Sequence, residues 1–367
     1  MQPTDPLDPP AAVEYRMPAE WEPHRGTWMA WPHRRSDWPG KFAPIPWVYG
    51  EIVRALARHE EVNLLVADAD HQFAARRVLK RAQADLGRVR FHVCPTDRSW
   101  VRDSGPIFIV NPDGKRVALD WHFNAWAKYP DWKLDDCVPG FVASVRGLPT
   151  IQPTLRGHWV VLEGGSIDVN GQGLMLTTEE CLLSTVQQRN PPMDRADYER
   201  VFADYLGVKK VLWLGQGVAG DDTHGHIDDL ARFVGTRTVL TVVEEDPADA
   251  NYRPLQENLD RLKGMTDLDG RPLEVVPLPM PRLLEFRGTR LPASYANFYI
   301  ANGVVIVPTF NDPKDRVALG TLAELFPDRE VVGIHCVELV WGLGTLHCMT
   351  QQEPAGQGDQ AADRTSG

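Results

Sequence analysis

The chain has 367 residues, 43% hydrophobic and 24% charged, a composition typical of a globular protein with a substantial core. Its formal net charge of −11 argues against nucleic acid as a partner, because binding phosphates requires a basic surface. No apolar run reaches the length of about 18 residues that predicts a membrane span. Five cysteines without short paired spacing predict free thiols in a reducing, cytoplasmic compartment.

The two ends of the chain are rich in Pro, Gly, Gln, Asp and Ala and contain almost no bulky apolar residues. This composition predicts disordered segments at residues 1–16 and 353–367. No low-complexity linker interrupts residues 17–352, which we expect to form a single domain. Two separate α/β domains are the structural alternative.

The first predicted elements are a strand at residues 26–31, a helix at 47–59 and a strand at 62–68. Together they look like a repeated unit that lacks one strand. The isolated apolar segment at residues 345–350 is predicted to be the missing strand. Both chain ends would then meet in one sheet, and the ring of units would leave no sheet edge exposed.

Four complete units follow, with strand–turn–strand patterns that open near positions 107, 166, 230 and 298, at separations of 59, 64 and 68 residues. Internal periodicity of this kind indicates a repeat fold. Tight turns are predicted at residues 112–114, at Asn170-Gly171 and at Asn302-Gly303, and every unit continues with a helix and a further strand, so that it reads β-β-α-β. The expected ranges are strands 107–110, 116–120 and 150–155 with a weak helix near Val142; strands 167–169, 174–177 and 209–215 with a helix at 194–207; strands 230–234, 238–243 and 273–279 with a helix at 255–264; and strands 298–301, 304–308 and 329–335 with a helix at 314–326.

Reactive side chains stand at matching places in these units. If the units are equivalent, their leading ends meet, and a thiol, an imidazole and three carboxylates share one site. That combination suits covalent attack on a cationic carbon. The residues are Asp103, Glu163, His226 with Asp228, and Asn297 before the four hairpins, and Cys348 in the last apolar segment.

A lone cysteine is more often a small buried hydrophobe than a nucleophile, and we interpret Cys94, Cys137, Cys181 and Cys336 in that way. Cys348 differs because glycines at positions 342 and 344 precede it and would allow a ligand to approach the backbone closely. It is therefore the candidate nucleophile.

The densest group of titratable residues lies at positions 221–229 and has two interpretations. His224 and His226 with the acidic residues that follow resemble the ligand run of a zinc hydrolase. Alternatively, His226 and Asp228 lie on a strand, where residues two apart share a face and can address one substrate.

Asp103 and Glu163 each lie beside small residues and, taken singly, could simply cap a turn. Asn297 could approach the reacting centre or satisfy backbone groups at the start of a strand. Trp121 and Trp126 could form a wall of a substrate channel or belong to the core.

Eight segments together resemble the agmatine deiminase family, part of a wider group of guanidine-modifying enzymes that includes bacterial-type peptidylarginine deiminases. The resemblance extends from about Met17 to Pro354. It implies a five-bladed α/β propeller of pseudo-symmetric β-β-α-β units. The segments are AEWEPHRGTWMAWP, WVRDSGP, DWHFNAW, LEGGSIDVNGQG, HGHID, YANFYIANG, VPTFNDPKD and LHCMTQQEP.

The resemblance also implies roles for the site residues. Asp103 and Asp228 would hold the guanidinium, Cys348 would attack its carbon to form a thiouronium intermediate, and His226, oriented by Glu163, would act as acid and base. Asn297, Trp121 and Asp222 are further substrate-binding candidates. No metal or organic cofactor is required, and we expect a small cationic guanidine as substrate and a homo-oligomer, dimer or tetramer.

The expected reaction is hydrolysis of agmatine to N-carbamoylputrescine and ammonia. Asp222 stands where many relatives carry Glu, and His224 stands where relatives are usually acidic, which leaves room for another guanidine. Alternatives are a deiminase or amidinotransferase acting on arginine or peptidyl-arginine, with Arg102 or Arg232 binding a carboxylate. A zinc hydrolase and a binding module without catalysis are less favoured.

Overall fold

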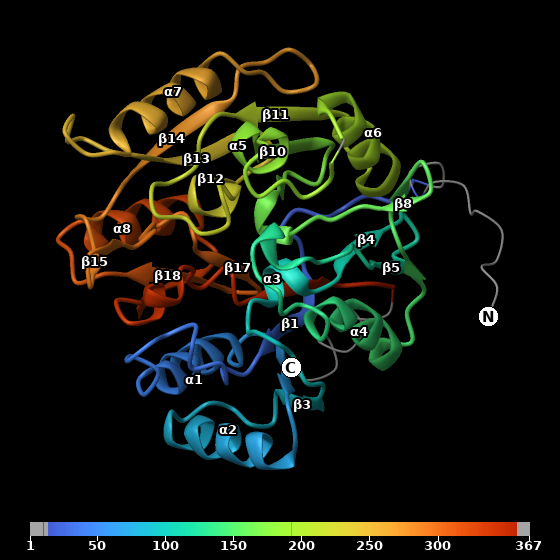
Figure 1. Cartoon of the computed structure of the whole chain (residues 1–367), viewed down its shortest axis with the longest axis vertical. Helices are drawn as coiled ribbons and strands as arrows, with labels where there is room; N and C mark the ends of the chain where they lie inside the picture. The colour runs from blue at the N-terminus through green and yellow to red at the C-terminus, as the bar shows by residue number, and fades with distance from the viewer. Residues whose placement is uncertain (1–9, 11–13, 192, 358–367) are drawn as a thin grey trace.

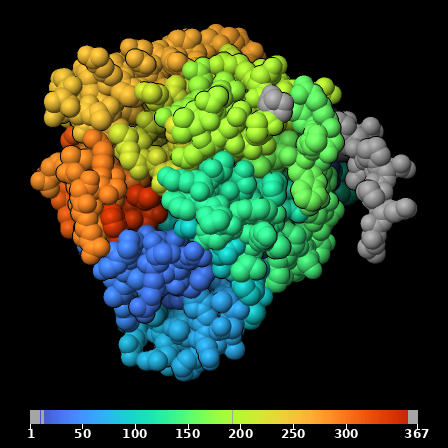
Figure 2. All heavy atoms as spheres, in the orientation of Figure 1, coloured from blue at the N-terminus to red at the C-terminus, as the bar shows by residue number. Residues whose placement is uncertain are grey.

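The computed structural model describes residues 10, 14–191 and 193–357, and its main sheets succeed one another around the molecule in chain order (Figure 1). Helices α2, α6 and α7 lie toward the rim of this view. The space-filling view in Figure 2 shows each stretch of the chain as a contiguous sector of the surface. Within these residues, no helix combines the length and the apolar character needed to cross a bilayer.

The four complete units predicted from the sequence are all present. In each of them the first two strands pair antiparallel and the second and third pair parallel. The units are β4 (Ile107–Val110), β5 (Arg116–Leu119), α4 (Val138–Arg146) and β6 (Thr150–Ile151); β9 (Asp168–Val169), β10 (Leu174–Thr178), α6 (Arg195–Leu206) and β11 (Lys210–Leu214); β12 (Ala231–Phe233), β13 (Thr238–Val243), α7 (Tyr252–Lys263) and β14 (Glu274–Pro279); and β17 (Tyr299–Ala301), β18 (Val304–Thr309), α8 (Asp315–Leu325) and β19 (Glu330–His335).

Local sequence explains these elements well. Gly114, Gly171 and Gly303 have φ values of 73°, 70° and 69° at the predicted turns, a region that glycine enters without steric cost. Helix α6 begins with a capping box in which the side chain of Asp194 accepts from the backbone of Asp197. The parallel third strand requires the intervening helix as a crossover.

Both chain ends share one sheet, as predicted, but the C-terminal strand was misplaced. Strand β20 (Gln351–Pro354) pairs antiparallel with β1 (His24–Ala30), and residues 345–350 form turns instead of a strand. The predicted tail boundary at residue 353 is therefore wrong. Glu353 is fully buried, and its carboxylate accepts hydrogen bonds from Trp28, Arg116 and Arg146. Most of the predicted disordered ends lie outside the described residues, although Arg16 forms a bridge with Val110.

The first sheet also contains more than the predicted elements. After β1, α1 (Ile45–Leu56) and β2 (Glu61–Val66), the chain adds α2 (Ala69–Arg81) and a fourth strand, β3 (Val89–Val93). Helix α2 buries only Ala75 and Leu79, so its weak apolar stripe explains why it was missed. The predicted strand at 150–155 is also divided between β6 and a hairpin of β7 (Thr154–Leu155) and β8 (His158–Trp159).

A short turn or helix precedes the first strand of each unit, and these segments carry the candidate site residues. Because every first strand is buried, its preceding turn is held at a defined place. The segments are α3 (Val101–Ser104), η4 (Gly164–Ser166), η5 (Ile227–Asp229), the turn at 295–297 and the turns after η6 (Leu339–Gly342).

The remaining short elements are η2 (Ala125–Ala127), η3 (Asp135–Cys137), α5 (Glu179–Leu183), β15 (Glu285–Phe286) and β16 (Thr289–Arg290).

Candidate active site

Cys348 lies in the turn before β20, and 7% of its surface is exposed. Its sulfur accepts from Asn297 Nδ2 at 3.1 Å and lies 3.6 Å from Asp228 Oδ2. Asn297 Oδ1 also accepts from the backbone of His347 and the hydroxyl of Thr345, so this amide holds the loop that carries the thiol. Both interpretations of Asn297 hold, because its amide contacts the sulfur and also satisfies the backbone N–H of His347.

Three functional groups converge on the backbone of Gly165. A Cβ atom there would lie 2.6 Å from His226 Nδ1, 2.7 Å from Asp103 Oδ1 and 3.0 Å from Asp228 Oδ2. These distances are shorter than ordinary contacts, so only glycine fits among them without displacing a side chain. The convergence of Asp103, His226 and Asp228 that the repeat predicted is therefore present.

Asp103 is held by two donors. Trp126 Nε1 donates to Oδ2 at 2.9 Å, and the backbone N–H of Gly165 donates to Oδ1 at 3.0 Å. Trp126 reaches this carboxylate from a turn in which Ala125, Trp126 and Ala127 have φ values of 51°, 58° and 53°. Three successive non-glycine residues in this region are uncommon, which indicates that the surrounding structure imposes the conformation.

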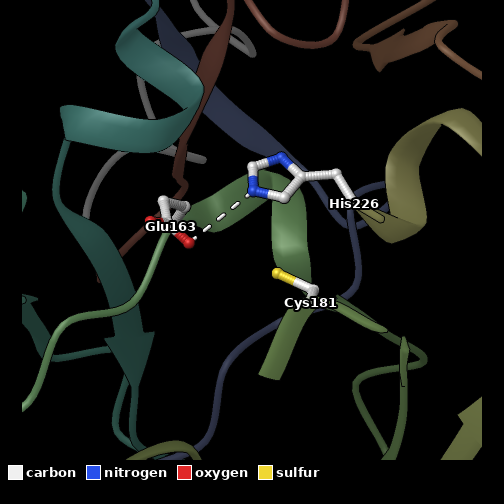
Figure 3. A group of neighbouring side chains, drawn as sticks. All are labelled: Glu163, Cys181 and His226. Carbon is white, nitrogen blue, oxygen red and sulfur yellow. Dashed lines mark ion pairs between the residues drawn. The ribbon is translucent and has the colours of Figure 1, made fainter. Parts of the chain in front are cut away.

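His226 lies between two carboxylates at distances too long for hydrogen bonds. Its Nε2 is 3.6 Å from Glu163 Oε2 (dashed line in Figure 3), and its Nδ1 is 3.8 Å from Asp103 Oδ1. Glu163 is oriented from its other side, because Arg189 Nε donates to Oε1 at 3.0 Å. Arg189 was not recognised from the sequence, since nothing local marks it.

The pKa values of these groups follow from burial and from the crowding of charges. Burial raises the pKa of Asp103 to about 6, in spite of the opposing effect of His226. Burial works to lower the pKa of His226, but Asp103, Cys181 and Glu163 together outweigh burial, and the pKa lies well above its usual range. Burial, assisted by Asp228, raises the pKa of Cys348 well above 9. The unliganded site therefore favours a protonated imidazole and a neutral thiol.

A buried network behind Asp228 was not foreseen. His347 Nδ1 lies 2.8 Å from Asp228 Oδ2, and its Nε2 lies 2.7 Å from Glu20 Oε2. Glu20 in turn pairs with Arg232 at 2.8 Å and with Arg102 at 3.4 Å. Both arginines are therefore committed to this network and do not line the cavity, contrary to the suggestion that they bind a substrate carboxylate. The only local signal was the position of His347 beside Cys348.

A cavity of about 400 Å³ gives access to the sulfur. Its lining includes the buried Asp103 and Cys348 and the more exposed Asp222, whose oxygens accept from Lys128 Nζ at 2.5 Å and from Tyr129 Oη at 2.6 Å. The full lining is Arg34, Ser36, Asp37, Arg98, Trp100, Asp103, Trp126, Tyr129, Pro130, Asp131, Asp222, Thr223, Gly342, Leu343, Gly344 and Cys348.

Two predictions about this region are wrong. Trp121 does not line the cavity, because it packs in a separate core cluster against Tyr205; Trp126 is the tryptophan at the site. His226 and Asp228 do not lie on a strand, since Asp228 belongs to the 3-10 turn η5. Their side chains nevertheless meet, because the turn brings both toward Gly165.

The zinc-hydrolase interpretation required His224 and His226 to converge. His224 Nε2 instead lies 3.1 Å from Ser184 Oγ, and its Nδ1 lies 3.9 Å from Glu180. A different group forms around His226: one ligand atom each from Glu163, Cys181 and His226 lie within 4.8 Å of one another. Cys181 is buried on α5 in a hydrophobic core cluster, as expected for a structural cysteine, but its sulfur also adjoins Glu163 and His226.

Comparison with known proteins places these features in a family. The model of the Porphyromonas-type peptidyl-arginine deiminases matches residues 16–354. Agmatine deiminases of Pseudomonas aeruginosa (strain LESB58) and Ectopseudomonas mendocina (strain ymp) are each 37% identical, over 96% and 95% of this chain and 99% and 98% of their own.

Solved structures agree with this result. The agmatine deiminase of Enterococcus faecalis superposes with a TM-score of 0.87 at 34% identity, covering 97% of this chain and 100% of the other. A Cys-to-Ser variant of the C. jejuni agmatine deiminase with substrate bound superposes with a TM-score of 0.83 at 31% identity, covering 93% and 97%. The mixed α/β fold of this chain is thus that of the agmatine deiminase structures.

Proposed function

Because the chain belongs to the family of Porphyromonas-type peptidyl-arginine deiminases and agmatine deiminases, we propose that it hydrolyses the guanidinium group of agmatine to N-carbamoylputrescine and ammonia. The observation that carries this proposal is the convergence of Asp103, Asp228 and His226 around Gly165, with the Cys348 sulfur 3.6 Å from Asp228 and lining a cavity together with Asp103. A thiol, two carboxylates and an imidazole are what guanidinium hydrolysis requires.

Substrate binding prepares the nucleophile. Asp103 and Asp228 would accept charge-assisted hydrogen bonds from the planar guanidinium. Burial raises the pKa of Cys348, and nearby carboxylates raise it further. The positive charge of the substrate offsets these carboxylates, so the thiol loses its proton to solvent as the cation binds. The enzyme therefore forms its thiolate only when a cation is in place.

The chemistry then proceeds in two halves. The Cys348 sulfur bonds to the guanidinium carbon, and the protonated His226 gives its proton to the departing ammonia, which leaves a covalent thiouronium. Neutral His226 next takes a proton from water as the water oxygen bonds to the same carbon. The carbon–sulfur bond then breaks and the hydroxyl proton of the adduct passes to solvent, which releases the neutral carbamoyl product and regenerates the thiolate. Glu163, held by Arg189, stabilises the imidazolium.

The distal amine of agmatine would approach Asp222, which lies on the same cavity. This carboxylate is paired with Lys128, so the substrate amine must compete with a resident cation. A second candidate substrate is free arginine, because Arg34 and Arg98 line the cavity near Asp222 and would attract a carboxylate. Both arginines are already paired with acidic residues, which favours agmatine.

The test is release of ammonia from agmatine, arginine and a short arginine-containing peptide, each given to chelator-treated protein. Release of ammonia from agmatine alone supports the proposal. Release from another substrate would mean that the enzyme uses the same mechanism on a different guanidine. No release from any of the three would contradict it.

We further propose that the five main sheets are the blades of an α/β propeller, and that residues 17–354 form one catalytic domain. We expect a homo-oligomer, either a dimer or a tetramer, and the molar mass from light scattering would test this. All five cysteines are free, which supports the expected cytoplasmic location.

A further inference from the structure

We propose that Glu163, Cys181 and His226 form an inhibitory site for a divalent cation of the zinc class, which stops the reaction by occupying the imidazole of His226. The binding part of this inference rests on the geometry alone. The inhibitory part rests also on the proposed role of His226 in the reaction.

The three side chains point toward a common space (Figure 3). Their ligand atoms, the sulfur of Cys181, a carboxylate oxygen of Glu163 and a ring nitrogen of His226, lie within 4.8 Å of one another. Among the described residues, this is the one group of three His, Cys, Asp or Glu side chains with such spacing. Thiolate, imidazole and carboxylate together are ligands that zinc accepts.

The polar atoms at this place lack other partners within the described part of the chain. Glu163 Oε2 and both ring nitrogens of His226 are buried without a hydrogen bond. Buried polar atoms are normally satisfied, because an unpaired one has lost its hydrogen bonds to water without replacement. A cation held between Glu163 Oε2 and His226 Nε2 would satisfy both atoms at once.

The spacing also suits a tetrahedral ion. Zinc bonds of about 2.0–2.2 Å to nitrogen and oxygen imply a ligand-to-ligand distance of about 3.4 Å. His226 Nε2 and Glu163 Oε2 are 3.6 Å apart, too far for a hydrogen bond but close to that value. Cys181 completes the third position after a small side-chain shift, and the fourth is left to water.

Neighbouring residues provide the outer contacts that metal sites require. Arg189 binds Glu163 through Oε1 and so leaves Oε2 directed at His226. When Nε2 holds the ion, Nδ1 carries the ring proton and faces Asp103 Oδ1, 3.8 Å away. A carboxylate behind a metal-bound imidazole fixes its orientation. Binding also releases the proton of the Cys181 thiol and the Nε2 proton of the His226 imidazolium.

The consequence is loss of catalysis without occupation of the nucleophile. His226 bound to a cation can neither protonate ammonia nor accept a proton from water. Because Glu163, Cys181 and His226 are all buried, we expect slow onset of inhibition and reversal by chelators.

Cadmium binding to the full-length Cys348→Ala protein tests the site without any assay of activity, since this variant lacks the thiol that lines the cavity. We expect one cadmium per chain and an ultraviolet thiolate-to-cadmium charge-transfer band. The band should disappear when Cys181→Ala or Cys181→Ser is added to this variant; the serine substitution nearly preserves side-chain size. Cys336→Ala, a matched change at another buried free cysteine, should leave the band in place. Thermal unfolding shows which variants are folded.

Zinc inhibition is then measured in chains that retain Cys348. The inhibiting zinc concentration should rise at least about tenfold in Cys181→Ala relative to both wild type and Cys336→Ala, because loss of an outer-shell contact alone costs that much. A band that persists without Cys181, or no band at all, overturns the site. A Cys181-dependent band in a protein that hydrolyses no guanidine leaves the site standing and contradicts the proposed function instead.

Discussion

His347 Nδ1 lies 2.8 Å from Asp228 Oδ2, the same carboxylate oxygen that lies 3.6 Å from the sulfur of Cys348. One buried carboxylate thus faces the nucleophile on one side and a fixed imidazole on the other. The imidazole is anchored in turn by Glu20, so the position of Asp228 depends on a residue near the start of the chain.

This relationship predicts a cost in stability. Replacing His347 with alanine leaves the buried carboxylates of Asp228 and Glu20 facing each other without the ring between them, and should lower the free energy of unfolding by about 3 kcal/mol. Urea denaturation measures the change. His335→Ala is the control, because His335 forms an exposed pair with Glu338 and should change stability by less than about 0.5 kcal/mol. Equal effects of the two substitutions would contradict the structural role of His347.

The nucleophile has a direct test. Cys348→Ser should reduce ammonia release from agmatine by at least about a thousandfold, because the hydroxyl replaces the only thiol at the cavity that can form the thiouronium. Steady-state rates at saturating agmatine measure the loss, and Cys336→Ser provides the control at a buried thiol remote from the cavity. A Cys348→Ser enzyme with full activity would show that the covalent mechanism is wrong.

The raised pKa of Cys348 predicts a particular pH dependence in the free enzyme. Only the thiolate reacts with iodoacetamide, and below its pKa the thiolate fraction grows about tenfold per pH unit. Because that pKa lies well above 9, the alkylation rate should still be rising at pH 9. A cationic haloacetamidine should react faster near neutral pH if, as proposed, Asp103 and Asp228 bind its charge. A plateau below pH 9 with the neutral reagent would count against this view.

Gly165 is predicted to be intolerant of even one added methyl group. The Cβ of Gly165→Ala would lie 2.6 Å from His226 Nδ1 and must displace it, so kcat should fall by about a hundredfold. Gly140→Ala is the matched control, because a Cβ there meets nothing within 4 Å on helix α4. The two variants are compared by kcat and by thermal unfolding, and an unaffected kcat in Gly165→Ala would disprove the tight convergence at this glycine.

Asp222 should determine recognition of the distal amine. Asp222→Asn is expected to raise KM for agmatine by about tenfold, equivalent to about 1.4 kcal/mol, with little change for an alkylguanidine that lacks the amine. Lys128→Met removes the resident cation from Asp222 and should lower KM for agmatine. If Asp222→Asn raises KM equally for both guanidines, this carboxylate does not bind the distal amine.

Much of the fold could be predicted because its signals are local. Alternating apolar strands, Asn-Gly turns and amphipathic helices recur with a similar spacing, and each depends on neighbours in the sequence. Helix α2 and strand β3 were missed because α2 buries so few apolar side chains that its periodicity is weak. Residues 345–350, predicted as a strand, form turns instead. Leu343, which precedes them, has a φ of 68°.

The candidate site divides in the same way. Cys348, His226, Glu163, Asp103 and Asp228 were identified from motifs and from their matched places in the repeat. The sequence by itself thus determined most of the elements, their order and the candidate reacting groups. Only the tertiary structure decided that Trp126 and not Trp121 reaches the cavity, that His347 links Asp228 to Glu20, and that Cys181 adjoins His226. The reason is physical: secondary structure reflects neighbouring residues, whereas pairing of buried charges depends on groups far apart in the sequence that only the folded chain brings together.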